Sequence, residues 1–142
     1  MWLETVVALV IGCQLSVAGE DVLTDRSART ECWILLSKAQ WGMSHQEQAS
    51  FIIRMPCGKL TFVRWPAPEE ANVQRYRGIP RGTVAIAHTH PNWLPMPSAI
   101  DRGTAKTAHV PVYVVTRSMI TLTDGRRTRV IVDGEWSPAS VL

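Results

Sequence analysis

Two histidines follow an uncharged apolar run in the middle of this chain, where residues 83–101 read TVAIAHTHPNWLPMPSAID. Residues 83–87 are bounded by Gly82 and contain no charge, which is typical of a strand buried in a sheet. If this strand continues through His88 and His90, its two-residue repeat points both imidazoles to the same face. The segment therefore predicts a central strand that ends in a pair of metal ligands.

A helix is predicted directly after the histidines, from Ser98 to Ala108. Ser98 takes the N-cap position and Asp101 follows three residues later, so the hydroxyl and the carboxylate lie on the same side of the first turn. Two neutral imidazoles and one carboxylate leave a fourth position open, as a catalytic zinc site requires. We therefore identify His88, His90 and Asp101 as candidate ligands of one Zn²⁺ per chain.

The remaining apolar periodicity predicts a mixed α and β domain. Residues 30–42 carry apolar side chains at i, i+3, i+4 and i+7, which predicts an amphipathic helix capped by Thr30 and stopped by Gly42. The segment from Pro66 to Gly82 is polar and is expected to be a surface excursion. Strands are expected at residues 51–53 and 60–63, which would form a hairpin, and at 110–115, 119–123 and 129–132.

The histidine segment resembles the signature of the JAB/MPN metallopeptidases, the JAMM family. That signature is His-x-His-Pro, six variable residues and then Ser-x-x-Asp. Its fixed positions are filled here by His88, His90, Pro91, Ser98 and Asp101. The resemblance covers about residues 29–132 and implies an α/β (α+β) fold of the cytidine-deaminase-like kind, a mixed β-sheet flanked by helices.

The resemblance also implies an activity, the zinc-dependent hydrolysis of peptide or isopeptide bonds. In the family the two histidines and the aspartate hold zinc, and the serine helps to position and stabilise the reacting oxygen. These roles are therefore expected of His88, His90, Asp101 and Ser98. Many relatives cleave bonds at ubiquitin or small ubiquitin-like modifiers, and others trim bacterial peptides or carrier proteins, so the expected substrate is a peptide or protein.

The family further uses an upstream glutamate as general base, and Glu31 and Glu47 are the two candidates. Glu31 falls at the start of the predicted first helix, where an acidic side chain complements the helix dipole without any further role. Glu47 directly precedes Gln48 and the predicted strand at 51–53, which is the position that the family pattern requires. We therefore expect Glu47 to accept the proton of the attacking water.

The rim of the site and the function class leave alternatives open. Trp93 lies in a loop restricted by three prolines, and it can form part of a substrate rim or cap the core. Besides the hydrolase, two other functions fit the sequence. One is a zinc-containing MPN-type binding or scaffold module without turnover, and the other is an amidase that acts on a cell-wall cross-link.

The N-terminal segment, residues 1–18, differs from the rest and is expected to be a signal peptide. Val6 to Ala18 is an apolar run of about 13 residues, too short to span a bilayer, and small residues precede a cleavage point before Gly19. We therefore expect export to the periplasm or outside the cell, with residues 19–142 as a single domain. A cytoplasmic protein with a buried first strand is the alternative.

Cysteine content and charge complete the sequence-based expectations. Removal of residues 1–18 leaves Cys32 and Cys57, which can form one disulfide or remain two thiols. The chain carries 15 Lys+Arg and 12 Asp+Glu, a formal net charge of +3. Because the basic residues form no dominant cluster, no nucleic-acid partner is expected.

Overall fold

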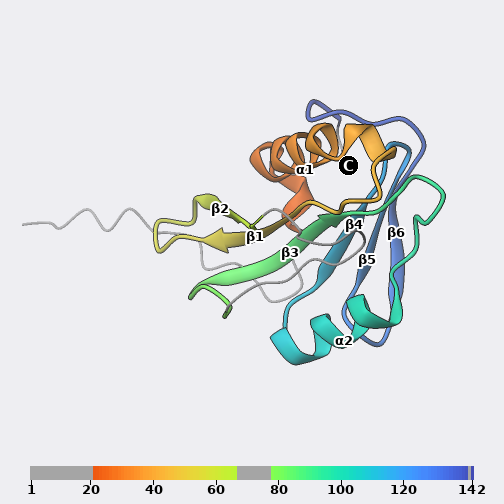
Figure 1. Cartoon of the computed structure of the whole chain (residues 1–142). Coiled ribbons are helices and arrows are strands. Elements are labelled where there is room, and N and C mark those ends of the chain that lie inside the picture. Colours follow the sequence, from red (N-terminus) through yellow and green to blue (C-terminus); the bar gives the residue numbers. More distant parts are fainter. Residues whose placement is uncertain (1–20, 67–77, 141) are drawn as a thin grey trace, which may run out of the picture.

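The computed structural model describes residues 21–66, 78–140 and 142, and its central feature is a six-stranded sheet with the order β2-β1-β3-β4-β5-β6 (Figure 1). Strands β3 and β4 are parallel, and the other neighbouring pairs are antiparallel. The expected mixed sheet is thus confirmed. The strands are β1 (Ala49–Arg54), β2 (Leu60–Arg64), β3 (Thr83–Thr89), β4 (Val112–Val115), β5 (Met119–Thr123) and β6 (Thr128–Asp133).

Two helices, α1 (Arg26–Lys38) and α2 (Ala99–Ala108), cover opposite faces of this sheet (Figure 1). Side chains alternate between the faces along each strand. On β1, Ile52 packs in the cluster that contains the buried residues of α1, whereas Phe51 and Ile53 pack with Ala105 of α2. The fold is therefore a three-layer arrangement in which the sheet separates two apolar clusters.

The first helix begins earlier than the apolar stripe predicts, so the assignment of Thr30 as its cap is wrong. The N-cap is Asp25, whose side chain accepts a hydrogen bond from the Ser27 backbone N–H at 2.8 Å. Thr30 lies inside the helix, and its hydroxyl donates to the carbonyl of Arg26. Sequence periodicity misses this first turn because the turn has few buried apolar side chains.

The helix also ends earlier than expected, at Lys38, and a short 3₁₀ helix, η2 (Gln40–Gly42), follows it. Gln40 and Trp41 have positive φ angles of 53° and 57°, and Gly42 has φ 82°. A Cβ atom at Gly42 would collide with the side chain of Asn92. Gly42 is therefore required by a close approach between two loops rather than as the helix stop.

The second helix and the later strands occur where the sequence places them. Ser98 is the N-cap of α2 and forms a capping box with Asp101. The strands differ from their predicted ranges only at their ends: β1 begins two residues earlier than expected, and β4 begins at Val112. A second 3₁₀ helix, η1 (Val22–Thr24), precedes α1.

Of the two alternatives for Cys32 and Cys57, one disulfide or two thiols, the structure has the thiols, because both residues are free cysteines. Cys32 is buried on α1, whereas Cys57 is exposed in the turn between β1 and β2. The expected signal peptide and most of the expected excursion from Pro66 to Gly82 lie outside the described residues. No helix within the described ranges is long and apolar enough to cross a membrane.

Candidate metal centre

Glu47, His88, His90 and Asp101 converge where the end of β3 meets the start of β1 and the start of α2. Because β1 and β3 are antiparallel and Ala49 pairs with His88, the chain just before β1 lies beside the end of β3. This pairing brings Glu47 to the histidines. The capping box of α2 places Asp101 in the first turn of that helix, where its carboxylate reaches both imidazoles.

The four side chains lie within contact distance of one another. Glu47 Oε2 is 3.3 Å from His88 Nδ1, and Glu47 Oε1 is 3.7 Å from His90 Nε2. Asp101 Oδ1 is 3.0 Å from His88 Nε2, and Asp101 Oδ2 is 3.3 Å from His90 Nε2. Glu47 has 17% of its side chain exposed, and the other three have 7–8%. Two acids and two imidazoles therefore share one largely buried site.

The donor atoms fit a bound metal ion. Ligand atoms of Glu47, His88 and His90 all lie within 4.8 Å of one another. Atoms held at about 2.0–2.1 Å in a tetrahedron lie roughly 3.3–3.4 Å apart, close to the separations found here. His88 Nε2 is buried and makes no hydrogen bond with good geometry, although Asp101 Oδ1 is near it. A cation between these atoms would give this buried nitrogen a ligand bond in place of a hydrogen bond with poor geometry.

The composition of this group differs from the expected ligand set in one respect. Glu47, which the sequence assigns as the base, belongs to the group of close ligand atoms together with His88 and His90. Asp101 lies beside that group, and its two oxygens face one histidine each. Both carboxylates are therefore within reach of the place where the imidazoles meet.

A neighbouring carbonyl fixes the orientation of His90. Its Nδ1 lies 2.8 Å from the carbonyl oxygen of Leu94. A carbonyl only accepts hydrogen bonds, so Nδ1 carries the proton and the Nε2 lone pair points toward the carboxylates. Such a bond to the second ring nitrogen is the usual support of a metal-binding histidine.

The electrostatics of the site favour a positive charge between the two acids. Burial of the His88 imidazole acts to lower its pKa, but the hydrogen bonds and charges of Asp101 and Glu47 outweigh burial and raise this pKa to about 9. Burial likewise acts to raise the pKa of Asp101, but the two histidines hold that pKa far below its ordinary range. Without a metal ion, a protonated histidine balances the acids, and a divalent cation can replace that proton.

Ser98 is exposed and holds Asp101 through two hydrogen bonds. Its backbone N–H donates to Asp101 Oδ2 at 2.6 Å, and its Oγ accepts from the Asp101 backbone N–H at 3.1 Å. Because a hydroxyl can accept and donate at the same time, Ser98 can also donate a hydrogen bond to a bound ligand. The structure thus places Ser98 next to the site, with a capping role that does not use its hydroxyl proton.

Glu31 lies away from this site. It is buried in the middle of α1 and accepts two hydrogen bonds from Arg64 of β2, from Nε at 2.9 Å and from Nη2 at 3.0 Å. The expectation that Glu31 lies at the helix start is wrong because α1 begins at Arg26. The choice of Glu47 as the acid beside the histidines agrees with this geometry.

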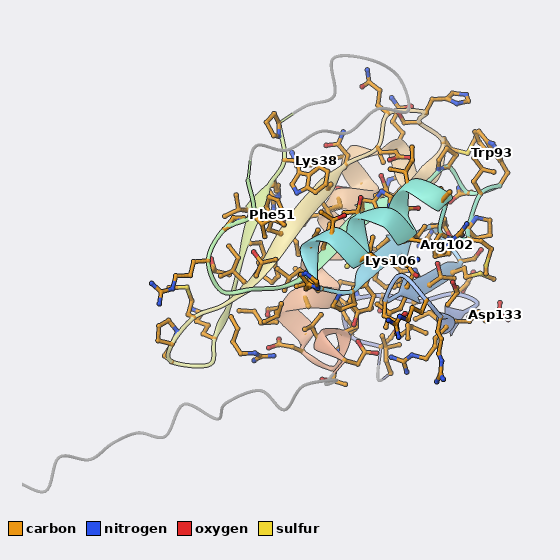
Figure 2. All side chains as sticks on the ribbon, turned by 90° about the horizontal axis from the view of Figure 1, so that it is seen from below. Lys38, Phe51, Trp93, Arg102, Lys106 and Asp133 are labelled. Atoms are coloured by element: carbon orange, nitrogen blue, oxygen red, sulfur yellow. The ribbon has the colours of Figure 1, made fainter. Side chains whose placement is uncertain are left out.

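Trp93 is 54% exposed, which excludes the alternative that it caps the core. Figure 2 places it at the outer edge of the molecule, and its ring contacts His45 edge-on at a centroid distance of 5.3 Å. His45 therefore lies in a loop beside Trp93. Trp93 lies three residues after His90, in the loop that leads to α2.

Two residues that hold the segments around the site in place, Asn92 and Thr89, were not identified from the sequence because they belong to no recognised motif. Asn92 donates from Nδ2 to the Trp41 carbonyl and accepts at Oδ1 from the Arg117 backbone N–H, each at 2.9 Å, and so joins three loops. Thr89 accepts a hydrogen bond from the backbone of Gln48. Only the strand register could have indicated the Thr89 contact, since the partners are far apart in the sequence.

A comparison with protein-family models matches residues 8–131 to the prokaryotic homologs of the JAB domain. The matched range contains all four side chains of the site and Ser98. Curated proteins and solved structures gave no significant match.

Proposed function

Because the chain belongs to the prokaryotic homologs of the JAB domain, we propose that it is a zinc-dependent hydrolase of peptide or isopeptide bonds. The observation that carries the proposal is the convergence of Glu47, His88, His90 and Asp101 in one buried site. The nitrogen and oxygen donors suit zinc, which prefers imidazole and carboxylate ligands at a four-coordinate site. His88, His90 and Asp101 would hold the ion.

The bound zinc would supply Lewis acidity and lower the pKa of water to about 7. Glu47 is the more exposed of the two carboxylates, so it is the acid that can exchange protons with a substrate. In the proposed reaction one carboxylate oxygen of Glu47 takes a proton from the attacking water and later gives it to the leaving amine. Ser98 donates its hydroxyl proton in a hydrogen bond to the carbonyl oxygen that becomes negative.

The surroundings of the site support a peptide or protein substrate. Residues 91–100, the loop after His90 and the start of α2, contain no charged side chain and expose several large apolar ones. Exposed apolar groups beside a catalytic site commonly contact a substrate. The exposed apolar residues of this rim, with Met43 from the facing loop, are Trp93, Leu94, Met96 and Ile100.

Hydrogen bonds hold the loop in place near His90 and near β5, in addition to those of Asn92. The Leu94 carbonyl lies against His90 Nδ1 at 2.8 Å, and the Pro95 carbonyl accepts a hydrogen bond from the Thr121 hydroxyl at 2.9 Å. A fixed loop presents its side chains without a large cost of ordering them when substrate binds. Substrate preference should therefore depend on Trp93 and its neighbours.

The test is a screen of peptide, isopeptide and cell-wall cross-link amides with the zinc-loaded full chain. Glu47→Gln keeps the shape of the side chain but cannot accept the proton, so it should retain zinc and lose most turnover. Glu31→Gln is the matched control, because Glu31 lies on α1 away from the site, and it should retain turnover. If the wild type cleaves no amide faster than Glu47→Gln, the protein is a binding module rather than a hydrolase.

A further inference from the structure

Thr89 lies between the two histidines of the metal centre and is itself buried. It is the last residue of β3, and it makes two hydrogen bonds to Gln48, just before β1. Its backbone N–H donates to the Gln48 carbonyl at 2.8 Å. Its Oγ1 accepts from the Gln48 backbone N–H at 2.9 Å. Both backbone polar groups of Gln48, its N–H and its carbonyl, are thus hydrogen-bonded to Thr89.

This pair departs from a regular antiparallel ladder. In a regular hydrogen-bonded pair the two residues exchange both bonds through their backbone groups. The ladder between β1 and β3 ends at Ala49 and His88. At the next position, Gln48 and Thr89, a continued ladder would have the Gln48 N–H donate to the Thr89 backbone carbonyl. Here it donates to the Thr89 side-chain oxygen. The Thr89 hydroxyl therefore extends the hydrogen bonding between β3 and the segment before β1 by one residue, to Gln48, which is the neighbour of Glu47.

We propose that Thr89 is a positioning residue that holds Glu47 against the two histidines. Glu47 is bonded covalently to the residue that Thr89 anchors, and its carboxylate oxygens lie 3.3 Å from His88 Nδ1 and 3.7 Å from His90 Nε2. Loss of the Thr89 hydroxyl would free the Gln48 N–H and let the Glu47 backbone move relative to β3. This inference rests on the proposed function for the role of Glu47, but its effect on metal binding can be measured without a substrate.

Two substitutions distinguish the effect of the Thr89 hydroxyl from the effect of the side chain's size. Thr89→Val replaces the hydroxyl by a methyl group of similar size, so the space stays filled and the Gln48 N–H loses its acceptor. Thr89→Ser keeps the oxygen and removes a methyl group. A residue that merely filled the core would tolerate valine better than serine, whereas a positioning residue should show the opposite order.

The experiment is a Co²⁺ titration of the metal-free full chain, followed by visible absorption, for the wild type, Thr89→Val, Thr89→Ser and Glu47→Gln. Loss of an outer partner of a metal site typically costs 10–100-fold in affinity, so we expect Thr89→Val to bind Co²⁺ about 10-fold more weakly. Its absorption bands should shift toward those of Glu47→Gln, and Thr89→Ser should match the wild type. Thermal unfolding of each metal-free variant measures any general loss of stability.

Thr89→Val with unchanged Co²⁺ affinity and absorption, even at a lower melting temperature, would overturn the proposal. Thr89→Ser that binds Co²⁺ about 10-fold more weakly than the wild type would overturn it too, and this result decides the matter if the valine variant does not fold. If the wild type binds Co²⁺ with the expected order of variants but cleaves no amide, the proposed hydrolase function fails and the role of Thr89 stands. A wild type that binds no Co²⁺ refutes both.

Discussion

Substitutions of Ser98 test its role, because a structural role and a catalytic role predict different losses of stability and of turnover. Its Oγ caps α2 by accepting the Asp101 N–H, and the proposed reaction uses its proton as a hydrogen-bond donor. Replacing an N-cap serine by alanine costs about 1 kcal/mol of stability, whereas glycine costs only a few tenths. Loss of a donor to a developing oxyanion costs on the order of 100-fold or more in turnover.

The two substitutions therefore separate the roles. Ser98→Ala should lower both stability and turnover. Ser98→Gly should leave the free energy of unfolding close to that of the wild type and still lose about 100-fold in turnover, because neither variant has a hydroxyl. The backbone angles of Ser98, φ −79° and ψ 173°, are accessible to any residue, so neither substitution adds strain. Ser98→Thr keeps the hydroxyl and serves as the control.

The measurements are urea unfolding of the zinc-loaded variants and kcat on the best amide found for the wild type. Zinc content should remain about one per chain in all three, since the Ser98 backbone N–H that holds Asp101 Oδ2 is unaffected. If turnover follows stability, so that Ser98→Gly is nearly as active as the wild type, Ser98 acts only as a helix cap. The assignment of its hydroxyl to the reaction would then be wrong.

Four further predictions concern the metal, the pH, the compartment and the cysteines. His88→Ala and Asp101→Ala should each abolish zinc binding, measured by metal analysis of the purified protein, and full retention in both would refute the ligand assignment. Because the pKa of His88 is raised from 6.5 to about 9, its protonation stabilises the metal-free fold fully below about pH 6.5, and this contribution is lost as the pH rises through 9. The melting temperature of the metal-free protein should therefore fall between pH 7 and about 9.5, and zinc should remove this fall, whereas an equal fall with zinc would mean that other groups cause it. If the chain is exported, the mature protein should begin near Gly19, and mass spectrometry would show this, whereas an intact N-terminus on recovered protein would contradict it. The thiols of Cys32 and Cys57 should not be joined to each other, and a disulfide-linked peptide between them in a digest would contradict the fold described here.

The sequence predicts the centre of this fold well because the evidence for it is local. The apolar run before His88 predicts a buried strand, and the spacing of Ser98 and Asp101 predicts a capping box, and both features depend on a few consecutive residues. The start of α1 was missed because Asp25 caps a turn whose side chains do not continue the apolar stripe. That error also placed Glu31 at a helix end instead of beside Arg64.

Contacts between distant segments were not accessible to the same reasoning. The two cysteines that remain after removal of residues 1–18 suggest a disulfide, but their number carries no information on distance, and Cys32 and Cys57 lie in different surroundings. The exposure of Trp93 likewise depends on what packs around its loop. Asn92 joins three loops through its side chain and excludes a side chain at Gly42, and nothing in the local sequence indicates those partners.

The position of Glu47 shows why strand register determines this site. The two histidines and Asp101 come from one short segment, but Glu47 lies 41 residues before His88. A slip of one residue in the pairing of β1 with β3 would turn the side chains of β1 to the opposite face and remove Glu47 from the imidazoles. The ladder already shifts between Ile52 and Ile53, so the pairs on the site side of that irregularity, together with the bonds between Thr89 and Gln48, are the ones that place the glutamate. The motif thus supplies the proposed ligands, and the strand pairing supplies the acid that the proposed reaction uses.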